Sequence, residues 1–166
     1  GDVPYIQEAL DYIGEGGTVL LADGVFGGFG NRDLDFHGKA VTLTSQSGSA
    51  DGCVIDCSGS AADPHRAIDF TEAGPQTRVE FITMRNGFAD RGGAIHCRPG
   101  SSPTLHGCVL ANNAAPFRGG ALYVDQGSPR IEACTFVGNQ TSGEGGAAHF
   151  AVGSHVDLAD CRFESN

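Results

Sequence analysis

Residues 128–139 read SPRIEACTFVGN and match residues 102–113, which read SPTLHGCVLANN, at an offset of 26 positions. A third copy, LADCRFESN, occupies residues 158–166, and an earlier copy, VEFITMRN, occupies residues 79–86. A fixed period of this length is typical of a solenoid, in which each repeat stacks on the next. The repeats therefore decide the fold of this chain.

A second element recurs between these copies and begins each time with a pair of glycines, which predicts a tight corner with a positive φ or without room for a Cβ. It reads GGAIHC at residues 92–97, GGALYV at residues 119–124 and GGAAHF at residues 145–150. Each repeat alternates apolar and polar residues over short segments separated by Gly, Asn, Ser and Pro, which indicates strands joined by turns. No repeat has a helical pattern, and a period of 26 is too short for a four-stranded propeller blade. We therefore expect an all-β parallel β-helix, a solenoid of about six coils of roughly 26 residues.

The N-terminal segment differs from the repeats. Apolar residues recur there at the spacing of one helix face, which predicts an amphipathic helix over residues 4–13. This stripe comprises Ile6, Ala9, Leu10 and Ile13. Terminal solenoid repeats need an atypical cap, and a helix laid across the first coil is one. We predict a single domain, residues 1–166, with a helical cap at residues 1–17 and β-helical coils at residues 18–166.

Equivalent positions of successive coils are expected to stack as columns of like residues inside the solenoid. The predicted apolar columns are Val79, Leu105, Ile131 and Leu158; Ile55, Ile82, Cys108, Cys134 and Cys161; Cys57, Met84, Leu110, Phe136 and Phe163; and Ile68, Ile95, Leu122 and Ala148. A further predicted column comprises Asn113, Asn139 and Asn166, whose amides can bond to one another and to the backbone at a bend.

The opening of the chain, IQEAL at residues 6–10 and GTVLLADG at residues 17–24, resembles that of exported right-handed parallel β-helix proteins. The Gly-Gly-Ala and Phe-x-x-Asn repeats are similar to those of pectin-lyase-like and polymorphic-outer-membrane-type repeat proteins. This resemblance implies a right-handed coil and an extracellular or cell-surface location. Because such proteins include polysaccharide lyases, hydrolases, adhesins and surface proteins, the resemblance leaves the activity open.

Composition excludes several classes of partner. Twenty acidic and ten basic residues give a net charge of −10, which argues against nucleic acid and against an anionic membrane surface. No apolar run is long enough to span a bilayer, so we expect no membrane insertion. The six cysteines form no Cys-x-x-Cys pair, and we expect them to be buried free thiols rather than a zinc site.

One outward column carries residues with possible chemistry: Asp69, His96, Tyr123 and His149. It is flanked by three arginines, Arg66, Arg91 and Arg118. An acid, two imidazoles and a phenol on one strand face are suited to bind or cleave a sugar. Solvent-facing strand positions are polar by default, however, and so we assign no catalytic residue. The lyases that the chain resembles use clustered acids for calcium and a Lys or Arg base, whereas the single lysine here, Lys39, lies in an early coil.

Acidic residues also raise the question of a metal. Glu80, His106 and Glu132 are predicted to share a column, but metal sites need converging ligands. We therefore predict no cofactor and keep scattered calcium binding by the acidic surface as an alternative.

We expect a structural role, as a rigid rod, stalk or filament-forming subunit. The alternatives are a glycan-binding adhesin and a carbohydrate-active enzyme, either a polysaccharide lyase or a hydrolase. No cap motif follows the last repeat, so its coil exposes backbone groups and the apolar rims of Leu158, Cys161 and Phe163. We expect this assembly edge, which ends at Asn166, to be covered by further coils or by another copy of the chain.

Overall fold

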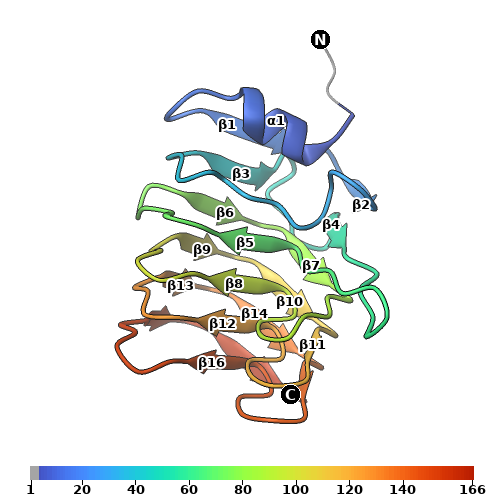
Figure 1. Ribbon diagram of the computed structural model, residues 1–166. Helices are drawn as coiled ribbons and strands as arrows, with labels where there is room; N and C mark the ends of the chain where they lie inside the picture. The colour runs from blue at the N-terminus through green and yellow to red at the C-terminus, as the bar shows by residue number, and fades with distance from the viewer. Residues whose placement is uncertain (1–3) are drawn as a thin grey trace.

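The computed structural model describes residues 4–166. This part of the chain is an all-β parallel solenoid of about five turns, with a single short helix, α1 (Ile6–Tyr12), near its N-terminal end. Figure 1 shows the coils stacked beneath one another, from α1 at the top to the C-terminus at the bottom. The predicted parallel β-helix is confirmed. The predicted cap begins at residue 1, and residues 1–3 of it lie outside the described residues.

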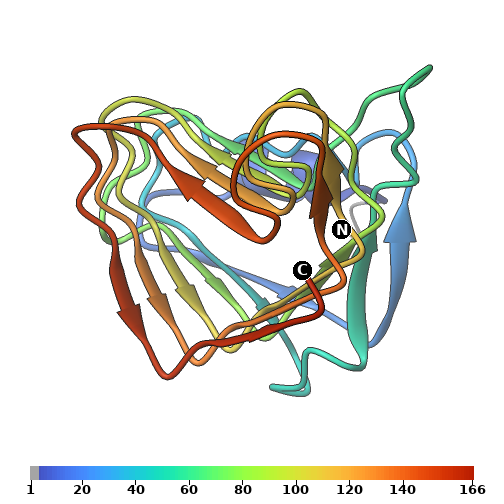
Figure 2. The same cartoon turned by 90° about the horizontal axis from the view of Figure 1, so that it is seen from below.

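Four parallel sheets run along the solenoid, and Figure 2 shows their strands on separate sides of the coil. In spatial order, the first sheet contains β1 (Thr18–Leu21), β3 (Thr42–Ser45), β6 (Arg78–Glu80), β9 (Thr104–His106), β13 (Arg130–Glu132) and β17 (Asp157–Ala159). The second contains β2 (Gly24–Gly27), β4 (Cys53–Asp56), β7 (Thr83–Arg85), β10 (Val109–Ala111), β14 (Thr135–Val137) and β18 (Arg162–Glu164). The third contains β5 (Ile68–Phe70), β8 (Ile95–Cys97), β12 (Leu122–Val124) and β16 (Ala148–Phe150). A small fourth sheet pairs β11 (Ala114–Ala115) with β15 (Gln140–Thr141).

Strand register confirms most of the predicted columns and corrects one coil. The first sheet aligns Val79, Leu105, Ile131 and Leu158, as predicted. In the second sheet, however, Ile55 pairs with Met84, so the predicted placement of Ile55 beside Ile82, and of Cys57 beside Met84, is wrong by two residues. A shift of two keeps every side chain on its own face of the strand, so alternation alone cannot detect it.

The repeated glycine pair forms a corner that other residues cannot form without strain. Gly119 has a φ of 61°, in the left-handed region that favours glycine. At Gly120, an added Cβ would lie 2.0 Å from the carbonyl oxygen of Gly146 on the next coil. Both predicted causes of the glycine pair, positive φ and lack of space, are therefore present. The corner brings the backbones of successive coils into close contact.

Helix α1 covers the first coil and is held there by polar contacts. Ile6 and Leu10 are buried, as the apolar stripe predicts. Lys39 donates hydrogen bonds from Nζ to the backbone carbonyls of Leu10 (2.9 Å) and Asp11 (2.7 Å). These carbonyls lie in the last turn of α1, where no further helical N–H group follows to bind them. No helix within residues 4–166 is long and apolar enough to cross a membrane.

A ladder of three asparagines, two of them buried, connects the last coils. Nδ2 of Asn113 donates to Oδ1 of Asn139 (3.0 Å), and Nδ2 of Asn139 donates to Oδ1 of Asn166 (2.8 Å). The backbone N–H groups of Asn113 and Asn139 donate to the same oxygens, each over 3.0 Å. Nδ2 of Asn139 also donates to the carbonyl of Leu110 (2.9 Å). The predicted asparagine column is confirmed, and every member bonds to the adjacent coil.

Asn139→Ala should lower the free energy of unfolding by about 1–3 kcal/mol, because it leaves a buried N–H of Asn113 without its partner and removes the amide bonds to the adjacent coils. Urea denaturation measures the change. Gln140→Ala is the matched control, since Gln140 is exposed, and it should change stability by less than about 0.5 kcal/mol. A loss below about 1 kcal/mol in the Asn139 variant would show that the ladder is not a main source of stability.

Candidate functional site

The outer face of the third sheet carries the predicted polar column. The strand pairs of β5, β8, β12 and β16 align it in the order Asp69, His96, Tyr123 and His149. Their neighbours along each strand point inward and are largely buried, so the four side chains lie on the outside of the coil. The sequence therefore predicts which residues share this face.

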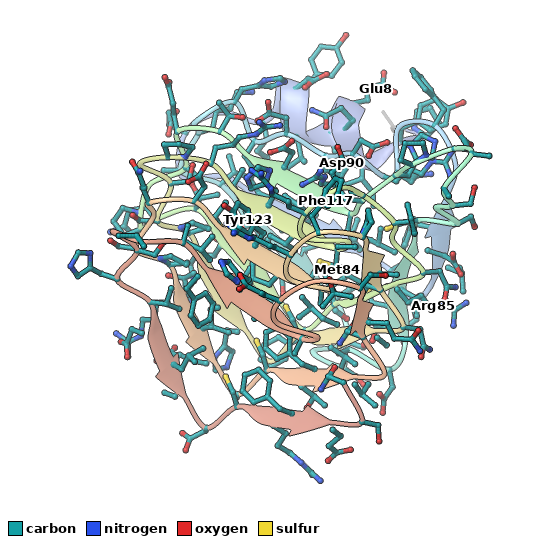
Figure 3. The ribbon with its side chains drawn as sticks, turned by 60° about the horizontal axis from the view of Figure 1, so that its bottom comes forward. Glu8, Met84, Arg85, Asp90, Phe117 and Tyr123 are labelled. Carbon is teal, nitrogen blue, oxygen red and sulfur yellow. The ribbon has the colours of Figure 1, made fainter. Side chains whose placement is uncertain are left out.

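Two members of the column are more buried than a solvent-facing strand position implies. His96 is only 8% exposed and Tyr123 only 3%. The Tyr123 ring lies 5.2 Å from the ring of His96 and stacks on that of His149 at 5.6 Å, as measured between centroids. Arg91 places its guanidinium carbon 5.4 Å from the centre of the Tyr123 ring. Figure 3 shows Tyr123 on β12, with Asp90 and Phe117 to one side. The expectation of an open, solvent-facing column is thus wrong for its two central members, because aromatic neighbours and Arg91 cover them.

Asp69 is held in an ion pair. Its two carboxylate oxygens accept hydrogen bonds from Nε (2.8 Å) and Nη2 (2.6 Å) of Arg98. Burial acts to raise the pKa of Asp69, but the Arg98 hydrogen bonds and the charge of Arg66 outweigh it, and the pKa is lowered. Asp69 is consequently ionised at neutral pH and orients Arg98 along the sheet.

His96 is a neutral imidazole in this environment. Burial, together with the positive charge of Arg66, lowers its pKa from 6.5 to about 4. Its Nε2 is buried and has no hydrogen-bond partner among residues 4–166. A buried polar atom without a partner is rare in a folded protein and calls for an explanation, such as a bound water or ligand atom.

A cleft of about 530 Å³ opens beside this column. It is lined by Asp33, Asp35, Arg66, Asp69, Thr71 and Arg98. Half-buried Arg66 donates from Nη1 to the backbone carbonyl of Arg91 (3.0 Å), but in the part of the chain that the structure describes it forms no ion pair. Its remaining N–H groups are available to an oxygen-bearing ligand.

Sequence reasoning identified Asp69 and noted Arg66 as a flanking residue, but it missed the other lining residues. Arg98 could have been found, because it lies two positions after His96 and so shares its face. Asp33 and Asp35 come from an earlier coil of irregular length, so the 26-residue period does not predict their place, although a parallel bridge between Leu34 and Ile68 aligns Asp35 with Asp69. The cleft is therefore a tertiary feature built on a column that the sequence does predict.

The other candidate groups serve the fold. Lys39, the only possible lysine base, binds the end of α1. Glu80 and Glu132 flank His106 in register, as predicted, yet each carboxylate binds an arginine of its own strand. Within residues 4–166, no three His, Cys, Asp or Glu side chains are grouped so that they could hold a metal ion.

The cysteines are packed inside the coil as free thiols. Five of the six are buried, and Cys161 is half-buried. Burial raises the pKa of Cys53 to about 11 and that of Cys57 to about 12, and it raises that of Cys97 further. Such thiols carry little thiolate and behave as small apolar side chains.

The predicted assembly edge lies on the last coil. Leu158 is on β17 and Phe163 on β18, and they are 41% and 49% exposed. Phe163 stacks on Phe136 with centroids 4.8 Å apart, so only one of its faces is covered. Cys161 is half-buried and Asn166 is exposed at the end of the asparagine ladder. The structure thus groups all four residues at one end of the solenoid.

His96→Phe should flatten the dependence of stability on pH. The folded protein holds His96 with a pKa of about 4, whereas the unfolded chain titrates near 6.5, so the stability that its neutral form contributes is complete above about pH 6.5. It is lost as the pH falls from about 6.5 to about 4. Urea denaturation from pH 7 to pH 4 should show the unmodified protein losing about 3 kcal/mol more than the variant. His155→Phe, at an exposed histidine, should follow the unmodified protein, and parallel profiles for His96→Phe would contradict the assignment.

Comparison with protein-family models, with curated proteins and with solved structures finds no match to this chain. What the structure establishes is the fold class, an all-β parallel solenoid. Any function must therefore be argued from the site geometry and from the exposed end of the solenoid.

Proposed function

We propose that the chain is a structural β-solenoid segment that forms part of a rod, stalk or filament by stacking further coils on its last coil. The observation that supports this proposal best is the exposed edge at β16, β17 and β18. Each of these strands is the last in its sheet and has a paired neighbour on one side only. A parallel strand with one free edge presents a row of backbone N–H and C=O groups to which another strand can bind.

Side chains at this edge have the pattern that unites the preceding coils. Phe163 continues the stack of Phe136, and Asn166 continues the ladder of Asn139. A further coil with the same repeat would place an aromatic ring over Phe163 and an amide over Asn166. The coil that covers this edge can come from a longer chain or from a second copy. In the second case the contact is head to tail and generates a filament unless a rotation closes it.

Type and location of the protein are part of the same proposal. The Gly-Gly-Ala corners and the Phe-x-x-Asn repeats support a right-handed, pectin-lyase-like coil. The acidic surface and the scarcity of lysine support an extracellular or cell-surface location, as does the likeness to exported β-helix proteins. A net charge of −10 also disfavours uncontrolled lateral association of such rods.

Light scattering across a concentration series tests the stacking. The 166-residue chain should increase in apparent mass with concentration, and Phe163→Asp should keep it monomeric, because a carboxylate at the centre of the apolar edge opposes its burial. Phe117→Asp is the matched control: Phe117 is 59% exposed on the preceding coil, where the backbone of Glu144 already binds its carbonyl, and its substitution should leave association unchanged. If the unmodified chain stays monomeric at high concentration and Phe163→Asp behaves identically, stacking through this edge is wrong.

Glycan binding in the 530 Å³ cleft is the second candidate, favoured by the N–H groups of the Arg66 guanidinium that form no ion pair within residues 4–166. A glycan array should then show binding that Arg66→Ala weakens by at least about tenfold, the effect of losing hydrogen bonds to a charged group. Arg118→Ala is the control. Arg118 lies at a corner two coils after that of Arg66, and it pairs with Glu144 outside the cleft. Release of reducing or unsaturated sugars would distinguish an enzyme from an adhesin, and an array without binding would remove this candidate.

A further inference from the structure

A pocket of about 450 Å³ lies at the α1 end of the solenoid, opposite the exposed C-terminal coil. Its walls come from α1 and from the segment that follows β2, and Figure 3 shows Glu8 at this end of the molecule. The lining side chains that a ligand in this pocket would contact are Tyr5, Glu8, Asp11, Phe29, Arg32 and Asp33. The volume is within the range of pockets that enclose small molecules.

Two aromatic rings form a corner of this pocket. The rings of Tyr5 and Phe29 lie edge to face, with centroids 6.2 Å apart and planes at 80°. Phe29 is 88% exposed and Tyr5 is 44% exposed, although both are large apolar groups. An exposed aromatic pair of this kind indicates a binding surface more often than a structural contact.

Hydrogen bonds fix the two walls relative to each other. The N–H of Gln7 donates to the carbonyl of Gly30 (2.8 Å), and the N–H of Ile6 donates to Oδ1 of Asn31 (3.0 Å). Gly30 has a φ of 78°, and an added Cβ would lie 2.7 Å from Cβ of Tyr5. The segment that carries Phe29 is therefore closely packed against the residue that carries the other ring, and the pocket needs little ordering to receive a ligand.

Charge in the pocket is negative and partly unused. Asp11 accepts a hydrogen bond from Nε2 of Gln7 (2.8 Å) and lies 3.3 Å from Nε2 of His37, and Asp33 binds His65. Glu8, in contrast, has no ion pair or hydrogen bond through its carboxylate within residues 4–166.

Arg32 and His65, which also line the pocket, each contact a residue outside it. Arg32 donates from Nη1 to the carbonyl of Cys57 (2.5 Å), and its Nη2 lies 3.8 Å from Asp63. His65 lies with Nε2 3.1 Å from the same Asp63. Arg32 and His65 thus both contact Asp63 in the segment between β4 and β5, and the pocket carboxylate without a partner within residues 4–166 is that of Glu8.

We infer that this pocket binds an alkylammonium cation, either free or at the end of a lysine side chain of a partner polypeptide. An ammonium group is attracted to the faces of Tyr5 and Phe29, and Glu8 supplies the opposite charge. Rings at 80° surround a compact cation, whereas a sugar ring stacks on a single flat face. The net charge of −10 raises the local concentration of cations around the protein.

The experiment compares a charged ligand with a neutral ligand of the same shape. Choline and its neutral isostere 3,3-dimethylbutan-1-ol are titrated by NMR, and the amide of N-acetyl-lysine represents the polypeptide source. Choline should bind with a millimolar dissociation constant and at least about fivefold more tightly than the isostere. Binding of the lysine amide at comparable affinity would identify a peptide side chain as a competent source, and its absence beside choline binding would identify a free cation.

Glu8→Gln and Phe29→Ala should each weaken choline binding by roughly three- to tenfold. Two controls match them: Asp51→Asn removes one exposed charge outside the pocket, and Tyr12→Ala removes a tyrosine of α1 that is 79% exposed and does not line it. Both controls should bind choline as the unmodified protein does. Equal affinity for choline and its isostere, equal losses in the controls, or no saturable binding up to about 50 mM choline would overturn the inference.

Discussion

Everything in this molecule depends on each coil placing its residues directly over the equivalent residues of the coil before it. Parallel strand pairing fixes successive backbones at about 4.8 Å, so a side chain must fit the same side chain one coil away. Apolar columns satisfy this condition by van der Waals contact, as Phe136 and Phe163 do with rings only 9° from parallel. Asparagine satisfies it by hydrogen bonding, because an amide donates and accepts in the same plane. The ladder from Asn113 to Asn166 thus joins coils at a bend where strand pairing is interrupted.

That condition also explains how much the sequence reveals. A period of 26 or 27 residues predicts the solenoid, the columns of the first and third sheets, the asparagine ladder and the glycine corners, all of which the structure confirms. The error at Ile55 arises because its coil has a different length, and alternation is unchanged by a shift of two residues. The burial of His96 could not be predicted, since strand alternation tells which face a residue occupies but not what covers that face. Arg91, which covers Tyr123, comes from a corner segment of the neighbouring coil.

Ionic contacts on the outer surface are largely local to a strand or to adjacent coils. Arg78 pairs with Glu80 and Arg130 with Glu132, each two residues apart on one strand face. Exposed pairs of this kind contribute little to the free energy of unfolding, so their main effect is to balance acidic and basic charges along the solenoid. Arg66 differs, because burial lowers the pKa of its guanidinium and, within residues 4–166, no carboxylate forms an ion pair with that group. This arginine without an ion pair therefore lines the cleft beside the third sheet, as expected where a protein keeps an unpaired charge to bind a ligand.

The surface features divide along the solenoid according to the regularity of the coils. Three clefts, of about 450, 530 and 250 Å³, meet at Asp33, which lies in the early coils where the repeat has insertions. A regular coil repeats the same small side chains and glycine corners, and the pocket beside its strands β11 and β15 is smaller, about 210 Å³. An insertion breaks that repetition, and its backbone leaves the stack to form a wall: the segment that carries Phe29 does so beside α1. The later coils, from Gly92 onwards, instead keep the repeat that another coil can continue. The irregular coils therefore carry the larger concave surfaces, where the proposed ligand sites lie, and the regular coils end in the strand edge at which we propose that a further coil stacks.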